Sequence, residues 1–226
     1  ALAPDYTGAQ WNLALAHLTL GNFAEGWAGY EWRWRHGDLA PRALPAPLWT
    51  GGDLAGKTLL VHAEQGLGDT LHFARYLPLL AERGARVLLE AQRPLLPLLA
   101  SLAGAAELVA AGDALPEFDL QVPLLSLPGA FATTLDDIPR AVPYLRAPPE
   151  RVAAWRAALA ALPHPRLGLV WAGSPGNRND RQRSLPLRRL APLLDLPGAS
   201  IVSLQAELRD GDAALLQRHS AEKGSS

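Results

Sequence analysis

The stretch "HAEQGLGDTLHF", residues 62–73, places two glycines and an acid at one turn. Gly66 and Gly68 have no side chains, so a ligand can approach the backbone closely there. Asp69 follows at the start of a segment with helical periodicity, where the positive end of a helix dipole would lie. Such a loop can hold a substrate while the carboxylate removes a proton from it. The alternative is that Asp69 only caps its helix.

This glycine loop lacks the remaining features of the common nucleotide-binding motifs. Leu71 stands where a dinucleotide fingerprint has its third glycine, and no lysine follows as in a P-loop. The loop comes after an apolar run that predicts a buried strand, and ligands of open α/β sheets bind beyond the carboxyl ends of strands. We therefore expect Glu64 and Gln65, together with the glycines and Asp69, to face a substrate crevice.

A second stretch, residues 171–189, concentrates positive charge after another predicted strand. Arginine suits phosphate oxygens because its planar fork donates two parallel hydrogen bonds, so a diphosphate is the anion that we expect here. The alternatives are a solvated basic loop and a Ser184 that merely caps the next helix. The candidate donor-phosphate residues are Asn177, Arg178, Arg181, Arg183 and Ser184.

Other chemistry-bearing residues give weaker signals. The six histidines show no spacing suited to a metal, and Asp210-Gly211-Asp212 is more typical of a capping turn than of a metal-binding D-x-D motif. His62 and His72 flank the glycine loop, and a structural role is the simpler interpretation of each. We predict no metal site and no cofactor.

Composition narrows the function classes further. The 226 residues are 49% apolar, carry a formal net charge of −1 and include no cysteine. Near-neutral charge gives no general reason to expect nucleic acid as a partner, and the lack of cysteine excludes a disulfide framework. No apolar run is long enough to span a membrane. We expect a cytoplasmic protein.

The periodicity of the chain predicts an α/β fold. Apolar runs at 57–63, 85–91, 106–111 and 118–124 predict strands, and the segments between the first three predict helices, as in a parallel Rossmann-like sheet. A helix over 148–162 and a strand over 165–173 begin a second unit. This unit reaches only about two strands before the sequence ends, so we expect an incomplete second Rossmann-like domain.

The first residues predict a helical hairpin. Apolar side chains recur at helical spacing on both sides of Gly21-Asn22 over residues 9–34, and the small residues Ala14 and Gly26 fall where the two helices would cross. The pattern resembles one tetratricopeptide repeat. Because a single repeat cannot bury both its faces, we expect either that further repeats precede Ala1 in the natural protein or that the hairpin packs its aromatic side chains on the next domain. In the alternative of a binding protein, the same aromatic side chains would bind a protein partner. The expected domains are 1–38 (hairpin), 39–147 (Rossmann-like), 148–220 (start of a second Rossmann-like domain) and 221–226 (disordered tail).

The two stretches in order, "LLVHAEQGLGDTLHFARYLPLLAERGARVLLEA" and "PRLGLVWAGSPGNRNDRQRSLPL", resemble the heptosyltransferase-like glycosyltransferases of family nine, in the variety fused behind tetratricopeptide repeats. The resemblance covers nearly the whole chain. It implies a GT-B architecture, with acceptor bound by the N-terminal domain and nucleotide sugar by the C-terminal one. It also implies an inverting, metal-independent transfer in which Asp69 matches the catalytic base and Arg183 lies toward the donor phosphates.

The family's later D-T-S-x-x-H-like loop, which contributes to the nucleotide site, has no counterpart before Ser226. We therefore expect this piece to be inactive alone. Two alternatives stay open. One is a non-catalytic interaction or scaffold protein with a degenerate transferase-like domain, and the other is a sugar-nucleotide epimerase or hydrolase. The sugar, the nucleotide and the acceptor are not specified by the sequence.

Overall fold

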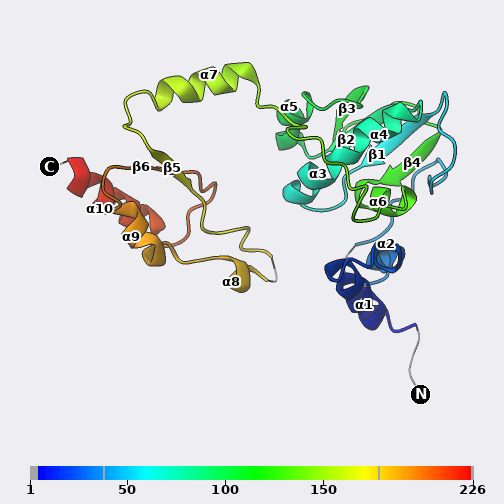
Figure 1. Ribbon diagram of the computed structural model, residues 1–226, viewed down its shortest axis with the longest axis horizontal. Coiled ribbons are helices and arrows are strands. Elements are labelled where there is room, and N and C mark those ends of the chain that lie inside the picture. Colours follow the sequence, from blue (N-terminus) through cyan, green and yellow to red (C-terminus); the bar gives the residue numbers. More distant parts are fainter. Residues whose placement is uncertain (1–4, 38, 178, 225–226) are drawn as a thin grey trace. The chain divides into compact units, whose positions relative to one another are not determined.

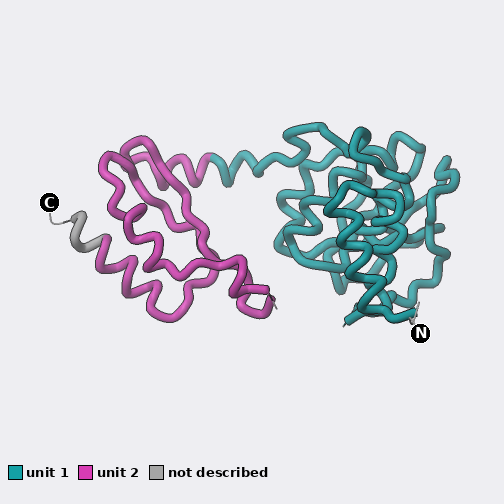
Figure 2. The backbone as a smooth tube through the Cα atoms, turned by 60° about the horizontal axis from the view of Figure 1, so that its bottom comes forward, with its two compact units in different colours: residues 1–152 teal, residues 153–226 magenta. Residues whose placement is uncertain are grey.

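The computed structural model describes residues 5–37, 39–177 and 179–224 of the chain, and of 220–224 only the backbone (Figure 1). The chain divides into two compact units, residues 1–152 and 153–226 (Figure 2). None of the described helices has the length and apolar character needed to cross a membrane.

Unit 1 contains a parallel sheet of four strands, β1 (Thr58–His62), β2 (Arg86–Ala91), β3 (Glu107–Ala110) and β4 (Leu120–Pro123), in the order β3-β2-β1-β4. Leu60 of β1 lies in register with Leu88 of β2 and Gln121 of β4. The expected α/β class with a parallel sheet is therefore confirmed. Because β2 and β4 flank β1 on opposite sides, the order of strands reverses at β1, and the carboxyl ends of β1 and β4 are where such sheets bind ligands.

Short helices cover one face of this sheet. They are α3 (Leu67–Phe73), α4 (Leu77–Glu82), α5 (Leu96–Leu99) and α6 (Leu127–Ala130). Leu59, Val61 and Leu89 of the strands are fully buried in one cluster with Leu77 and Leu80 of α4. Burial of side chains of this kind contributes about 1.5–3 kcal/mol each. The helical segment after the glycine loop is interrupted by a 3₁₀ turn at Ala74–Tyr76, just before Pro78, which has no N–H to continue the helical hydrogen bonds.

The hairpin at the start of unit 1 consists of α1 (Thr7–Thr19) and α2 (Phe23–Tyr30), followed by a 3₁₀ helix over Glu31–Trp34. Two helices over 9–34 are thus present as predicted. Their crossing is close: a Cβ added to Gly26 would lie 2.6 Å from Cδ2 of Leu18, and one added to Gly29 would lie 2.8 Å from Cβ of Ala14. Helix α2 also contacts α6 of the sheet domain.

Unit 2 is smaller. Its strands β5 (Arg166–Leu169) and β6 (Ser200–Ser203) pair in parallel, and its helices are α8 (Asp180–Arg183), α9 (Ala191–Leu194) and α10 (Asp212–Gly224). Helix α7 (Pro149–Ala158) leads into it along the sequence. The buried core comprises Trp171, Ala172, Leu187 and Leu194. Helix α10 extends into the stretch 221–226, for which the sequence predicts a disordered tail.

One buried arginine joins the hairpin to the sheet domain. Arg33 is 1% exposed, and its NH2 donates to Oε1 of Glu64 at 3.1 Å and to Oγ of Ser126 at 2.7 Å. Its NH1 donates to Oε1 of Glu31 at 2.7 Å. The guanidinium also lies 4.2 Å from the ring centroid of Trp34. Because Glu64 and Ser126 follow β1 and β4, Arg33 fixes the hairpin to the carboxyl edge of the sheet.

Replacing Arg33 with leucine is expected to destabilise unit 1 by about 3–5 kcal/mol at neutral pH, because the buried carboxylate of Glu64 loses its ionic partner. Burial already raises the pKa of Glu64, and Arg33 opposes that rise. The pKa in the folded variant should therefore be higher still. A carboxyl with a raised pKa favours the fold at low pH and loses that contribution as the pH rises through its pKa, so the deficit should shrink toward pH 4.5.

Urea unfolding followed by near-ultraviolet circular dichroism measures this effect, and Arg35→Leu is the matched control. Arg35 is exposed and its guanidinium lies over the ring of Trp32, so its replacement should cost about 1 kcal/mol or less. The double variant Arg33→Leu/Glu64→Leu should recover part of the loss, because no buried charge is then left unpaired. Equal effects of the two single variants would show that Arg33 does not have the assigned role.

Candidate functional site

Glu64 lies just beyond the carboxyl end of β1, with its side chain 7% exposed. Its Oε1 accepts hydrogen bonds from Arg33 and from the backbone N–H of Leu125 at 3.2 Å, which joins the ends of β1 and β4. Its Oε2 is buried and has no hydrogen-bond partner among the described residues. The loss of water on burial raises the pKa of this carboxyl. Glu64 therefore connects Arg33 of the hairpin with the ends of β1 and β4.

Gln65 connects the glycine loop to the hairpin and to β2. Its Nε2 donates to the hydroxyl of Tyr30 at 3.1 Å, and its carbonyl accepts from Nε2 of Gln92 at 2.8 Å. The hydroxyl of Thr70 donates in turn to Oε1 of Gln92 at 2.9 Å. These side-chain contacts hold the loop in one conformation between elements that are distant in sequence.

Asp69 caps the N-terminus of α3. Its Oδ2 accepts the backbone N–H of Gly66 at 3.0 Å, which satisfies one of the donors left open at a helix N-terminus. Gly66 and Gly68 are exposed, and a Cβ added to Gly68 would meet nothing within 4 Å. Gly66, Gly68 and Asp69 thus lie at one turn with open space in front of Gly68. The side chains of Glu64 and Gln65 do not face that space as expected, because Glu64 is buried against Arg33 and Gln65 contacts Tyr30.

The two histidines that flank this loop contact neighbouring side chains of unit 1. His62 is 3% exposed, and its Nε2 lies 2.9 Å from Oε1 of Gln121. Burial lowers the pKa of His62, so the ring is neutral at physiological pH. His72 packs against the ring of Phe73, with 5.1 Å between the ring centroids. Across the described residues there is no cluster of three or more potential metal ligands.

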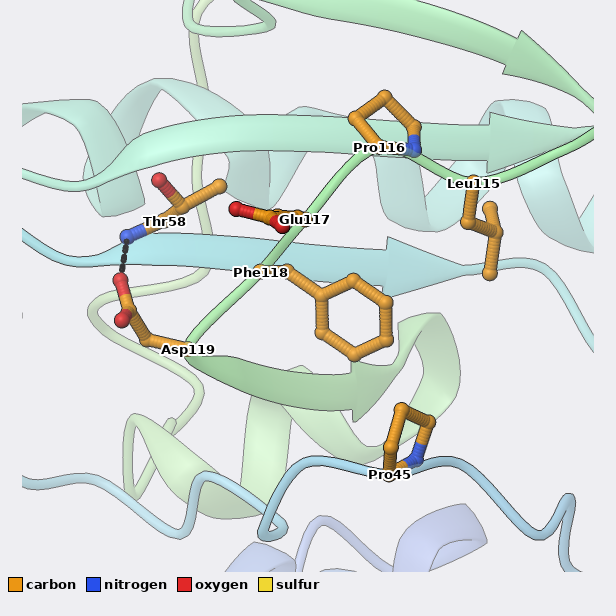
Figure 3. A pocket seen from close by; sticks show the side chains of 7 residues that line it. All are labelled: Pro45, Thr58, Leu115, Pro116, Glu117, Phe118 and Asp119. Atoms are coloured by element: carbon orange, nitrogen blue, oxygen red, sulfur yellow. Dashed lines mark hydrogen bonds between the residues drawn. The ribbon is translucent and has the colours of Figure 1, made fainter.

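One cavity of unit 1 lies away from these residues. It has a volume of about 640 Å³ and is at the amino end of β1, where the loop carrying Glu117 and Phe118 crosses the strand (Figure 3). Asp119, one of its polar side chains, already accepts the N–H of Thr58 at 2.7 Å. Ligands of open parallel sheets bind at the opposite edge, so this cavity is not a candidate substrate site.

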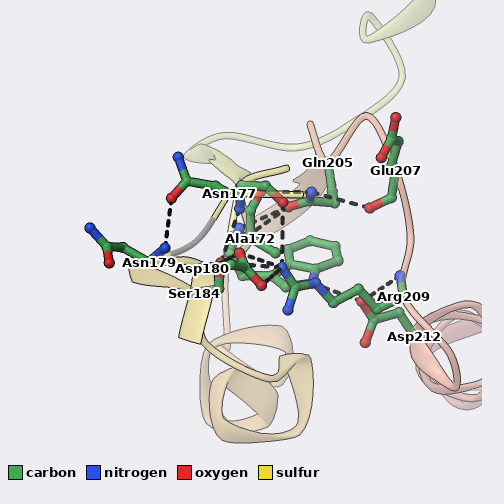
Figure 4. Close-up of polar contacts among 11 residues, drawn as sticks. Ala172, Asn177, Asn179, Asp180, Ser184, Gln205, Glu207, Arg209 and Asp212 are labelled. Carbon is green, nitrogen blue, oxygen red and sulfur yellow. Dashed lines mark hydrogen bonds and ion pairs between the residues drawn. The ribbon is translucent and has the colours of Figure 1, made fainter. Parts of the chain in front are cut away.

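In unit 2 a network of polar contacts surrounds Asp180 and Arg209 (Figure 4). The NH2 of Arg209 lies 2.7 Å from both carboxylate oxygens of Asp180, and the hydroxyl of Ser184 donates to Asp180 at 2.5 Å. The hydrogen bond from Arg209, and next the one from Ser184, lower the pKa of Asp180. The carboxylate therefore stays ionised and fixes the guanidinium of Arg209.

The same network includes the start of α10. Oδ2 of Asp212 accepts the indole N–H of Trp171 at 2.9 Å and the backbone N–H of Arg209 at 3.2 Å. Gln205, which follows β6, accepts the backbone N–H groups of Trp171 and Ala172 through Oε1. The Asp210-Gly211-Asp212 stretch thus forms a turn at the start of a helix. Together these contacts connect the loops that follow β5 and β6.

A cavity of about 540 Å³ opens beside this network. Within the described parts of the chain, no acidic side chain pairs with Arg181, Arg188 or Arg218, whereas Arg209 is held by Asp180. Positive charge therefore exceeds negative charge in the cavity even with Asp210 and Asp212 present. The four arginines that line it are Arg181, Arg188, Arg209 and Arg218.

The predicted donor-side residues fall into three groups. Arg181 and Ser184 line the arginine cavity. Asn177 and Arg183 do not: Oδ1 of Asn177 accepts the N–H of Asn179, and the Arg183 guanidinium packs so close to Gly173 that a Cβ there would lie 2.6 Å from its NH2. Arg178 lies outside the described residues.

Sequence reasoning missed the two arginines that organise these sites. Arg33 stands in "EWRWR" among aromatic residues, which gives no sign of a buried ion pair. Arg209 follows the second strand of unit 2, at the carboxyl edge of a predicted strand. Because ligands of open α/β sheets bind beyond the carboxyl ends of strands, the position of Arg209 after a predicted strand could have identified it.

The chain is similar to a known protein. The chain is 31% identical over 222 residues to the protein FlbA of Caulobacter vibrioides. The match covers 89% of this chain but 37% of that protein, so the chain spans little more than a third of the length of its relative. No family model matches the chain, and no solved structure matches it.

Proposed function

We propose that this chain is part of a glycosyltransferase that moves a sugar from a nucleotide-diphosphate donor to an acceptor hydroxyl. Residues 39–147 would form the acceptor domain of a GT-B architecture, and residues 148–220 would begin the donor domain. The observation that carries the proposal is the pair of parallel βα units. One presents a carboxylate on a glycine turn at its carboxyl edge, and the other presents an arginine-lined cavity beside its strand-end loops.

The proposed chemistry assigns one role to each edge. Asp69 accepts the proton of the acceptor hydroxyl while that oxygen attacks the anomeric carbon. The bond from the anomeric carbon to the diphosphate breaks on the opposite side, so the configuration inverts. The diphosphate leaves with its negative charge stabilised by Arg181 and the neighbouring arginines. Arginine side chains can supply this charge without a metal ion.

Preorganisation of the arginine cavity supports the donor role. Only NH2 of Arg209 is bound by Asp180, Ser184 and the carbonyl of Gly173, so NH1 and Nε are left without partners among the described residues. A guanidinium held on one side by a carboxylate loses less freedom when it binds an anion on the other. Ser184 lines the cavity and belongs to the same network.

A non-catalytic interaction protein is the alternative. It is favoured by exposed apolar side chains on α1, where Leu13 is 53% exposed and Leu15 is 38% exposed. In that case partner binding through the hairpin would be insensitive to Asp69 and to the arginine cavity, and nucleotides would not bind.

Inorganic pyrophosphate is expected to bind the arginine cavity, with an affinity that falls as salt is added. Arg218→Gln and Asp180→Asn should each weaken it by about tenfold. The first removes a direct charge, and the second releases Arg209. Isothermal titration calorimetry measures both, with Arg156→Gln, an exposed arginine of α7, as the matched control. If Arg156→Gln and Arg218→Gln have the same effect, the cavity is not the anion site.

Asp69→Asn is expected to lower turnover by about a hundredfold or more, because a general base contributes at least that much. Asparagine keeps an oxygen for the N–H of Gly66, so the unfolding free energy should change little. Asp69→Ala should also lose about 1 kcal/mol of stability, since it leaves that donor unpaired. The assay is release of nucleoside diphosphate from nucleotide sugars by the natural protein. Unchanged turnover in Asp69→Asn would reject Asp69 as the base.

A further inference from the structure

One peptide group of the glycine turn is held at both of its polar ends. The carbonyl of Gln65 accepts a hydrogen bond from Nε2 of Gln92 at 2.8 Å. The N–H of Gly66 belongs to the same peptide group, and it donates to Oδ2 of Asp69 at 3.0 Å. The C=O and N–H of a trans peptide point in opposite directions. Gln92 and Asp69 therefore bind this group, which we call the 65–66 peptide, from opposite sides.

Gln92 is itself fixed in place. It directly follows β2, and its backbone carbonyl accepts the N–H of Leu95 at 2.9 Å where a short 3₁₀ helix begins. The partners also determine how its side-chain amide is oriented. The Gln65 carbonyl can only accept, so Nε2 must face it, and Oε1 then accepts from the hydroxyl of Thr70 at 2.9 Å. Thr70 is fully buried. Gln92 thus connects the end of β2 to the turn through both atoms of its amide.

The carboxylate of Asp69 is bound through one oxygen. Oδ2 accepts the N–H of Gly66, whereas Oδ1 has no hydrogen bond or ion pair among the described residues. The space beside Oδ2 is narrow, because a Cβ added to Gly66 would lie 3.0 Å from it. Gly66 has a φ of −71° and a ψ of 168°, which other residues also adopt. A side chain at position 66 would therefore be restricted by the carboxylate and not by the backbone.

The hydrogen bond from Gln92 favours the one from Gly66 to Asp69. A peptide whose carbonyl accepts a hydrogen bond is polarised, so its N–H becomes a stronger donor. If the 65–66 peptide turned over, its carbonyl oxygen would face the carboxylate of Asp69, and its N–H would face the amide N–H of Gln92. Both hydrogen bonds would be lost, and both new contacts would be repulsive. Gln92 therefore stabilises the orientation that Asp69 requires.

We propose that Gln92 is a positioning residue for Asp69 and acts through the 65–66 peptide. It keeps the carboxylate in one orientation, with Oδ2 occupied and Oδ1 left to take the proton of the acceptor hydroxyl. The proton transfer rests on the proposed function. The link from Gln92 to Asp69 does not depend on it, so the two can be tested separately.

The link is tested by hydrogen exchange of the Gly66 amide, followed by nuclear magnetic resonance on the whole ¹⁵N-labelled chain. Gln92→Met keeps the length of the side chain but removes both hydrogen bonds, and it should speed exchange by about threefold to tenfold. Asp69→Ala removes the acceptor and should speed exchange as well. The double variant should exchange no faster than Asp69→Ala, because Gln92 protects this amide only through its bond to Asp69.

The matched control is Gln121→Met. Gln121 is half-buried like Gln92, and its side chain also contacts a polar partner, Nε2 of His62 at 2.9 Å, but it has no contact with the turn. This variant should leave the exchange of the Gly66 amide unchanged. The link is overturned if Gln92→Met and Gln121→Met give equal exchange rates, or if the effects of Gln92→Met and Asp69→Ala multiply in the double variant.

The consequence for catalysis is tested by release of nucleoside diphosphate from nucleotide sugars by the natural protein. Gln92→Met should lower kcat by about tenfold and leave the KM for the donor unchanged, because it displaces the base without touching the donor. Gln121→Met should change neither. Faster Gly66 exchange in Gln92→Met with an unchanged kcat would overturn the positioning role. If the natural protein shows no turnover, the proposed function fails, and the exchange rates alone decide whether Gln92 positions Asp69.

Discussion

The buried guanidinium of Arg33 is the interaction on which the arrangement of unit 1 depends. It binds Glu31 from the hairpin, Glu64 from the end of β1 and Ser126 from beyond β4. Removing a partner from a buried charge typically costs about 3–5 kcal/mol, so these contacts favour the arrangement that brings the three elements together. The hairpin is therefore an integral part of the sheet domain, and the glycine loop is held from below by Glu64 and from the side by Gln65.

Unit 2 uses the same physical device on a smaller scale. Asp180 begins α8 and Arg209 follows β6, and their ion pair fixes Arg209 in the wall of the arginine cavity beside Ser184. The unit has a two-stranded sheet, so polar contacts of this kind carry a larger share of its organisation than in unit 1. In both units a buried carboxylate and an arginine determine what the carboxyl edge presents.

Much of the fold could be predicted from the sequence, because apolar runs of strand length and the glycine punctuation are local signals. The parallel sheet and the hairpin follow from them. Ligands of open α/β sheets bind beyond the carboxyl ends of the strands, and this rule drew attention to the turn around Gly66 and to the arginine-rich stretch 171–189. What local patterns could not show is pairing between distant residues. Arg33 finds Glu64, and Arg209 finds Asp180, only after folding. Arg183 is of a residue type that often binds phosphate, but its guanidinium packs against Gly173 and does not line the cavity.

The central claim is that the protein binds a nucleotide-diphosphate sugar as its donor. Calorimetric titration with UDP, GDP, ADP and CDP tests this claim most directly. The account predicts that one of the four binds in a one-to-one complex that weakens as salt is added and is lost when Arg181 and Arg218 are both replaced by glutamine. The claim would be contradicted if the natural protein bound none of the four nucleotides. It would also be contradicted if the wild type bound all four weakly and the double variant bound them with the same affinity.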